Sequence, residues 1–83
     1  MFGNNKQETI ARINELTNEA EKLNRKIFKL KTFIEAKELR TELTDDEKTY
    51  VEKCNQQVTF MNVYYEQLQD RAVLLQHSLE KEN

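Results

Sequence analysis

The sequence predicts an all-α fold, an antiparallel two-helix coiled-coil hairpin that occupies residues 1–83 as a single domain. Two long stretches carry apolar residues at alternating intervals of three and four, which is the seam pattern of helices that pack side by side. A helix-capping motif separates the two stretches. The chain also has no proline and only one glycine, so little in it favours the turns of a sheet fold.

The first helix is expected at about residues 6–39. Its seam residues repeat at two heptad positions without interruption, and they are Ile13, Ala20, Ile27 and Ile34 at one position and Leu16, Leu23 and Leu30 at the other. Asn4 and Asn5 precede the helix, and either side chain is suited to cap it. Leu39 and Leu43 are expected to pack over the open end of the seam.

The second helix is expected at about residues 45–81, after a turn at residues 40–44. Thr44 and Glu47 have the spacing of a capping box, and the carboxylates in the first turn complement the positive end of the helix dipole. Its seam residues are Val51, Val58, Tyr65, Ala72 and Leu79 at one position and Cys54, Met61, Leu68 and Leu75 at the other. Because the connection is short and the helices have similar lengths, we expect them to pack antiparallel.

Several large apolar residues fall outside both seams, and they are Ile10, Phe28, Phe33, Phe60, Val63, Val73 and Leu74. Phe60, Val63 and Leu74 lie roughly along one line, on the side of the second helix that faces away from the first. Burying each such side chain is worth about 1.5–3 kcal/mol. A chain this short has a small core of its own. We therefore expect a homo-oligomeric helical bundle, either a dimer or a higher ring.

Composition and motifs exclude several classes of function. The net charge of −2 disfavours extended nucleic acid as a partner. The chain has no apolar run of membrane-spanning length and no secretory signal features, so we expect a cytoplasmic protein. Cys54 is expected to be a small buried hydrophobe, because it lies in the seam. His77 is expected to be solvated, because it lies on the outer face and has no histidine or cysteine at metal-ligand spacing. With no nucleophile–base pair and no glycine-rich phosphate loop, the sequence predicts a non-enzymatic protein without catalytic residues, metal or cofactor.

The candidate ligand surface is a line of residues at intervals of seven beside the second seam: Gln57, Tyr64 and Arg71. In an antiparallel pair this line meets the first helix at Arg12, Glu19, Lys26 and Phe33. Arg71 and Lys26 are suited to bind phosphate, Tyr64 and Phe33 to stack on a base, and Gln57 to contact a polar edge. The alternative is that these are ordinary flanking residues whose stems cover the core.

A basic cluster lies in the first helix and consists of Lys22, Arg25, Lys26, Lys29 and Lys31. One interpretation is a solvated face that pairs with acidic residues of a neighbouring subunit. The other is a local phosphate site within an acidic protein, of a size that suits a compact ligand. A small nucleic-acid accessory factor is a third hypothesis, and it would bind oligonucleotides in a strongly salt-dependent way.

Three segments carry a resemblance to a known group of proteins. They are KLKTFIE at 29–35, LT-x-x-E at 43–47 and Q-x-x-x-M-x-x-Y-x-x-x-L-x-x-R at 57–71. Together they resemble small helical-hairpin proteins of tailed bacteriophages, including crAss-like phages, over roughly residues 10–75. The matching positions of the last segment are Gln57, Met61, Tyr64, Leu68 and Arg71. The chain departs from the pattern at Phe60, where that group often has alanine.

A looser resemblance is to viral sponge proteins, which are small helical hairpins that oligomerise and sequester nucleotide immune signals. Those signals include the cyclic oligonucleotides of CBASS and the ADP-ribose derivatives of Thoeris. The resemblance implies a phage-encoded oligomeric binding protein that acts in the host cytoplasm. It would sequester a host nucleotide second messenger and so block anti-phage defence. The alternative is a non-enzymatic phage protein-interaction module, such as an adaptor, an assembly factor or an inhibitor of a host protein.

Overall fold

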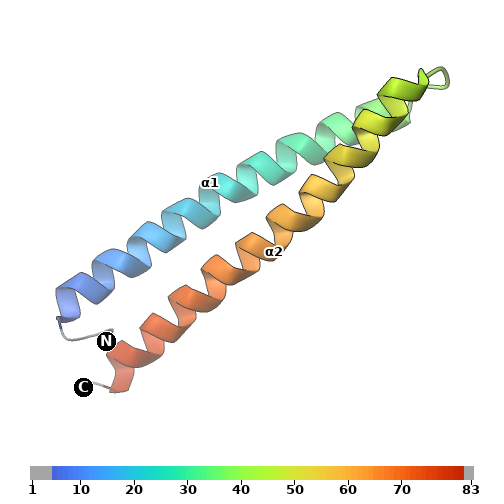
Figure 1. The fold of residues 1–83 in the computed structure, drawn as a ribbon. Coiled ribbons are helices and arrows are strands. Elements are labelled where there is room, and N and C mark those ends of the chain that lie inside the picture. Colours follow the sequence, from blue (N-terminus) through green and yellow to red (C-terminus); the bar gives the residue numbers. More distant parts are fainter. Residues whose placement is uncertain (1–4, 82–83) are drawn as a thin grey trace.

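The computed structural model describes residues 5–81, which form two helices. Helix α1 spans Lys6–Glu38 and helix α2 spans Asp45–Lys81. The two helices run side by side in opposite directions, joined by a short turn (Figure 1). The predicted fold class, an all-α antiparallel hairpin, is confirmed.

Helix α1 begins at a side-chain cap. The Asn5 side chain accepts hydrogen bonds from the backbone N–H groups of Gln7 at 2.9 Å and Glu8 at 3.4 Å. These N–H groups have no partner within the helix, so the cap stabilises the first turn. Glu8 in the first turn and Lys37 in the last turn also complement the helix dipole. Of the two predicted capping residues, Asn4 lies outside the described residues.

Helix α2 begins at the predicted capping box. The backbone N–H of Thr44 donates to the Glu47 carboxylate at 3.0 Å, and the backbone N–H of Glu47 donates to the Thr44 hydroxyl at 3.1 Å. These hydrogen bonds lower the pKa of Glu47, and the positive charges of Lys37 and Arg40 lower it further. Lys37 Nζ lies 3.6 Å from the same carboxylate, so an ion pair joins the end of α1 to the start of α2.

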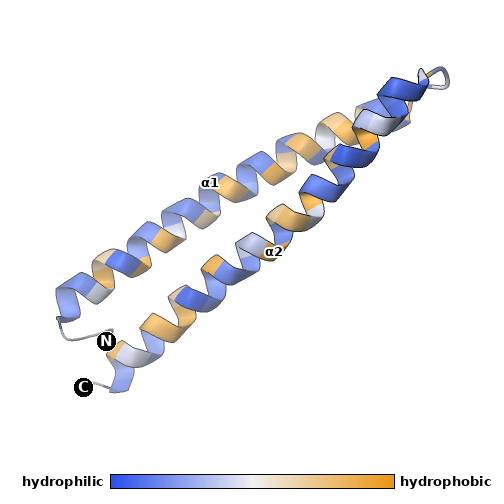
Figure 2. Cartoon of the chain, in the orientation of Figure 1, coloured by the Kyte–Doolittle hydropathy of each residue, from blue (hydrophilic) through white to orange (hydrophobic). Residues whose placement is uncertain are grey.

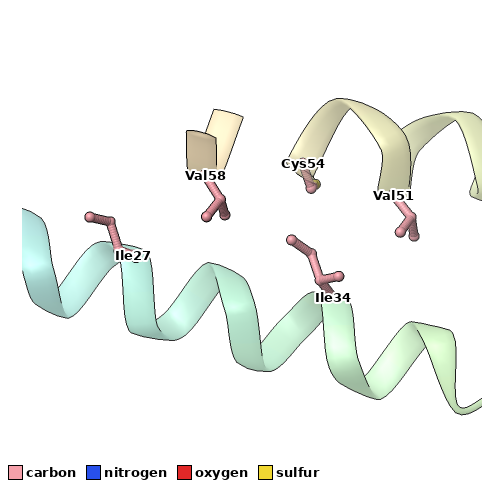
Figure 3. Close-up of a cluster of buried hydrophobic side chains, with 5 residues drawn as sticks. All are labelled: Ile27, Ile34, Val51, Cys54 and Val58. Carbon is pink, nitrogen blue, oxygen red and sulfur yellow. The ribbon is translucent and has the colours of Figure 1, made fainter. Parts of the chain in front are cut away.

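The two seams form the core of the hairpin. All predicted seam residues are buried or half-buried, and the buried ones are Leu16, Ala20, Ile27, Ile34, Val51, Cys54, Val58, Leu68, Leu75 and Leu79. Near the turn, Ile27 and Ile34 point from α1 toward Val51, Cys54 and Val58 of α2 (Figure 3). A second cluster continues the core toward the other end of the hairpin, with Leu68 fully buried at its centre.

The pattern of burial differs from the prediction at two positions. Thr9 is buried, because it lies seven residues before Leu16 and continues the same heptad position; its hydroxyl donates to the Asn5 carbonyl oxygen at 3.2 Å. The prediction that Leu39 packs over the open end of the seam is wrong, since this residue is 84% exposed. Leu39 lies two residues beyond the seam position of Lys37, so it faces away from α2. Leu43 is half-buried.

Large apolar side chains also lie on the outer surface. Phe60 is 72% exposed, Val63 52% and Leu74 58%, all on α2. Phe28 is similarly exposed on α1. Figure 2 shows hydrophobic segments recurring along both helices between polar ones. Neither described helix has an apolar stretch that is long enough to cross a membrane.

Candidate ligand-binding groove between the helices

One edge of the hairpin brings the predicted site residues of the two helices opposite one another. We call it the Tyr64 edge. Its four levels, from the open end toward the turn, are Arg12 opposite Arg71, Glu19 opposite Tyr64, Lys26 opposite Gln57, and Phe33 opposite Tyr50. Each step of seven residues along α1 is matched by a step of seven residues back along α2, as an antiparallel heptad register requires.

At the Tyr64 level, the two helices are joined by a hydrogen bond. The Tyr64 hydroxyl donates to the Glu19 carboxylate. This hydrogen bond raises the pKa of Tyr64, desolvation and the charge of Glu19 raise it further, and the nearby charge of Arg71 acts in the opposite direction. Tyr64 is therefore a neutral phenol whose hydroxyl is engaged, while part of its ring stays exposed.

A groove lies on the turn side of this hydrogen bond. It has a volume of about 450 Å³ and is lined by Lys26, Lys29, Leu30, Phe33, Tyr50, Gln57 and Met61. The half-buried side chains of Leu30 and Met61 supply an apolar floor. The polar groups that line it come from two lysines, one amide and the phenol of Tyr50. Its volume lies in the range of about 300–1,000 Å³ that is usual for small-molecule sites.

An aromatic pair closes the turn-side end of this groove. The rings of Phe33 and Tyr50 meet edge to face, with centroids 5.9 Å apart and planes at 78°. Lys37 Nζ lies 5.7 Å from the Phe33 centroid, where it also pairs with Glu47. Beyond the pair is a second groove that contains the carboxylates of Asp46 and Glu47. The aromatic pair thus separates a groove lined by two lysines from one lined by two carboxylates and Lys37.

Arg71 lies apart from the other predicted residues. It lines a smaller pocket of about 190 Å³ at the open end, together with Arg12, Leu16, Leu74 and Leu75. On α2 it is fourteen residues from Gln57, which corresponds to about 21 Å along the helix. The structure therefore brings Lys26, Phe33 and Gln57 into one groove, places Tyr64 at the next level of the same edge, and puts Arg71 in a separate pocket.

Two of the polar residues that line the groove were not predicted as site residues. Tyr50 lies seven residues before Gln57, so extending the predicted line by one heptad would have found it. Lys29 belongs to the basic cluster, and it lines the groove because it lies one helical turn from Lys26.

The side chains that line this groove are suited to bind a small polar ligand. Its apolar floor is surrounded by two lysines that supply positive charge, two aromatic rings that supply stacking surface, and one amide. In residues 5–81, no group of three or more histidine, cysteine, aspartate or glutamate residues is placed to hold a metal ion. His77 is exposed and Cys54 is a buried thiol of the core.

Comparison with known proteins identifies a family that the chain resembles. No curated protein and no solved structure matches the chain. A family model described as Sequestin matches residues 11–74, a range that includes every residue that lines the groove of Lys26 and Gln57. The name denotes sequestration, and the match confirms the resemblance to sponge proteins that the sequence showed. Since the match covers well over half of the residues, the chain belongs to the Sequestin family.

Proposed function

We propose that this chain sequesters a small nucleotide by binding it non-catalytically in the groove of Lys26, Lys29, Phe33, Tyr50 and Gln57. The observation that carries the proposal is the composition of this groove, in which cationic, aromatic and amide side chains surround an apolar floor. Lysines bind phosphate as point charges, and aromatic rings stack on bases at about 1–3 kcal/mol for each base. Membership of the Sequestin family supports sequestration as the outcome of binding.

Each side chain has a distinct role in the proposed complex. Lys26 and Lys29, which form no ion pair within the described part of the chain, contact phosphate. Phe33 and Tyr50, whose rings meet edge to face, supply aromatic surface on which a base can stack. The Gln57 side chain carries both a donor and an acceptor, so it is suited to hydrogen-bond a base edge.

The proposed ligand is a host nucleotide second messenger, either a cyclic oligonucleotide or an ADP-ribose derivative. A phage-encoded protein that binds such a signal tightly in the host cytoplasm lowers its free concentration and blocks the defence that depends on it. Sequestration requires no chemical step, so the proposal fits a groove that offers binding groups alone.

Isothermal titration calorimetry tests this function with a panel of cyclic dinucleotides, cyclic trinucleotides and cyclic ADP-ribose isomers. We expect one member to bind, and the double substitution Lys26→Gln with Lys29→Gln to weaken its binding at least tenfold. The matched control is Lys53→Gln, on the outer face of α2. Folded protein that takes up no member of the panel, or a control variant that loses as much affinity as the double variant, would refute the proposal.

We further propose that the hairpin self-associates through its outer apolar residues. Phe60, Val63 and Leu74 are more than half exposed on α2, and exposed apolar surface of this kind marks interaction sites. The same surface supports a second candidate function, a protein-interaction module that binds a host protein. Sedimentation equilibrium distinguishes the two proposals. Self-association predicts an oligomer that the substitutions Phe60→Ser and Val63→Ser reduce to monomers. The second function predicts a monomer that retains one stoichiometric host protein in a pull-down.

A further inference from the structure

The two helices lie side by side, so the hairpin has two broad faces. One face contains the Tyr64 edge. The other contains the opposite edge, where Thr17 of α1 and Gln69 of α2 line a shared groove. We call them the Tyr64 face and the Gln69 face. Residues seven apart lie nearly above one another along a helix of such a pair, so each row of heptad-spaced residues belongs to one side of the hairpin.

The outer rows of the Gln69 face carry acidic residues and no cation. Glu21 of α1 and Val73 of α2 line the groove of this face, so they identify the row of each helix that borders it. Steps of seven residues from these two positions give the charged members of both rows, which are Glu21, Glu35, Asp45, Glu52, Glu66 and Glu80. None of the six forms an ion pair within residues 5–81. Phe28, which is 71% exposed, lies midway between Glu21 and Glu35, so this face surrounds an exposed ring with negative charge.

The matching rows of the Tyr64 face are basic along their middle part. Lys29 of α1 lines the lysine groove and Leu74 of α2 lines the pocket of Arg71, so these two residues identify the rows. The charged members are Lys22, Lys29, Lys53 and Lys81, with Glu8, Glu15 and Asp46 toward the ends. The four lysines form no ion pair in the described part of the chain, whereas Glu15 lies 3.7 Å from Arg12. Phe60, which is 72% exposed, lies seven residues after Lys53, so on this face the exposed ring lies among cations.

The two faces are therefore opposite in charge and alike in apolar content. The net charge of −2 for the whole chain conceals this division. Contact between two copies of the same face would place like charges against one another, which is costly at an interface. Contact between the two different faces instead joins lysines to glutamates and brings exposed apolar side chains to both surfaces. Charge complementarity thus identifies a second copy of this chain, in one relative orientation of faces, as the partner that fits.

The size of a face is also sufficient for a stable interface. The hairpin measures 60 × 16 × 14 Å. Contact over a whole face of 60 × 16 Å would bury on the order of 1,900 Å² on the two copies together, and stable interfaces bury about 1,200–2,000 Å². Most of a face must therefore take part, which the spread of the charged rows along both helices permits.

We propose that copies of this chain stack face to face, with the Tyr64 face of one copy on the Gln69 face of the next. This arrangement rests on the self-association proposed above and names the two surfaces that meet. Because each copy uses a different surface on either side, the contact is heterologous, and the stack either closes into a ring or continues. The lysine groove opens on the Tyr64 face, so a bound nucleotide and the acidic face of the next copy compete for the same lysines.

Charge reversal with rescue tests the stack by sedimentation equilibrium. One variant carries Lys22→Glu and Lys53→Glu on the Tyr64 face and keeps both lysines of the groove. The other carries Glu52→Lys and Glu66→Lys on the Gln69 face. Each variant alone opposes like charges, so we expect its association constant to fall at least tenfold. An equal mixture of the two variants restores opposite charges at each contact, so we expect association to recover.

The controls address folding and nonspecific charge effects. All four substituted residues are exposed, and lysine and glutamate have similar helix propensities, so circular dichroism at 222 nm should show unchanged helix content. The matched control is Arg25→Glu with Asp70→Lys, at exposed positions on rows that border neither face, and we expect association within twofold of the parent protein. A mixture that stays dissociated, single variants that associate as the parent protein does, or a control that loses as much association as they do overturns the proposal.

The outcomes separate the stack from the functions proposed above. If Phe60→Ser and Val63→Ser dissociate an oligomer that the charge reversals leave intact, self-association stands and the stack fails. A monomeric parent protein overturns both. Nucleotide binding is tested separately by calorimetry, because the charge-reversal variants retain Lys26 and Lys29.

Discussion

Replacing Leu68 with alanine tests the core of the hairpin most directly. Leu68 is the fully buried side chain at the centre of the cluster that includes Leu16, Ala20 and Leu75. A buried Leu→Ala change costs about 2–5 kcal/mol, from lost transfer free energy plus the cavity left behind. Two packed helices leave the neighbours room to collapse into the gap, so we expect about 2–4 kcal/mol. For a chain of this length the melting temperature then falls by about 10–25 °C.

The assay is thermal and urea unfolding followed by circular dichroism at 222 nm. All variants are compared at one protein concentration, because self-association would make the melting temperature depend on concentration. The control is Leu39→Ala, the same chemical change at a residue that is 84% exposed, and we expect an effect within about 0.5 kcal/mol. If both variants melt within a few degrees of the parent protein, Leu68 does not carry the core and the described seam packing is wrong.

Three further predictions concern single interactions. Thr44→Ala removes the cap of α2 and lowers the free energy of unfolding by about 1 kcal/mol, measured by urea denaturation. Folding lowers the pKa of Glu47, so ionised Glu47 stabilises the protein fully above its ordinary pKa of 4.5, and this stabilisation is lost as the pH falls through the lower pKa of the folded state. The free energies of unfolding of Glu47→Gln and of the parent protein, measured against pH, should therefore converge in acid. Folding raises the pKa of Tyr64 above 10.0, so the hydrogen bond from Tyr64 to Glu19 stabilises the protein below that pH and is lost as the pH rises through the pKa of the folded state. Glu19→Gln should shift the titration of Tyr64, followed by ultraviolet absorbance at 295 nm, to lower pH. An unchanged titration would contradict the hydrogen bond.

The core was predictable because its signal is periodic and redundant. Ile27, Ile34 and Val58 each occupy a heptad position that several other apolar residues also mark, so no single residue decides the pattern. The start of α2 was predictable for a different reason, since Thr44 and Glu47 are chemically complementary at a fixed spacing. Thr9 was missed because a search for apolar residues at seam positions does not detect a polar side chain. Thr9 can nevertheless be buried, because its hydroxyl donates to the Asn5 carbonyl oxygen at the start of the helix.

The arrangement of the candidate site was only partly predictable. The seven-residue interval correctly placed Gln57, Tyr64 and Arg71 on one edge, opposite α1. Periodicity identifies a line, however, and each heptad advances the line by about 10.5 Å, so residues on one line do not share one pocket. Which residues meet depends on the register, and the register depends on the turn length and on the full set of seam contacts. That Arg12 and Arg71 line the same pocket became visible only once that register was known.

The regular register of the Tyr64 edge makes the hairpin modular. Each level is formed by one heptad of α1 and one heptad of α2, so removing or adding a matched pair of heptads leaves the remaining levels intact. Changing one helix alone would bring different residues opposite each other at every level beyond the change. The distance along the hairpin between the groove of Lys26 and the pocket that Arg71 lines is therefore adjustable in steps of about 10.5 Å, the length of one heptad.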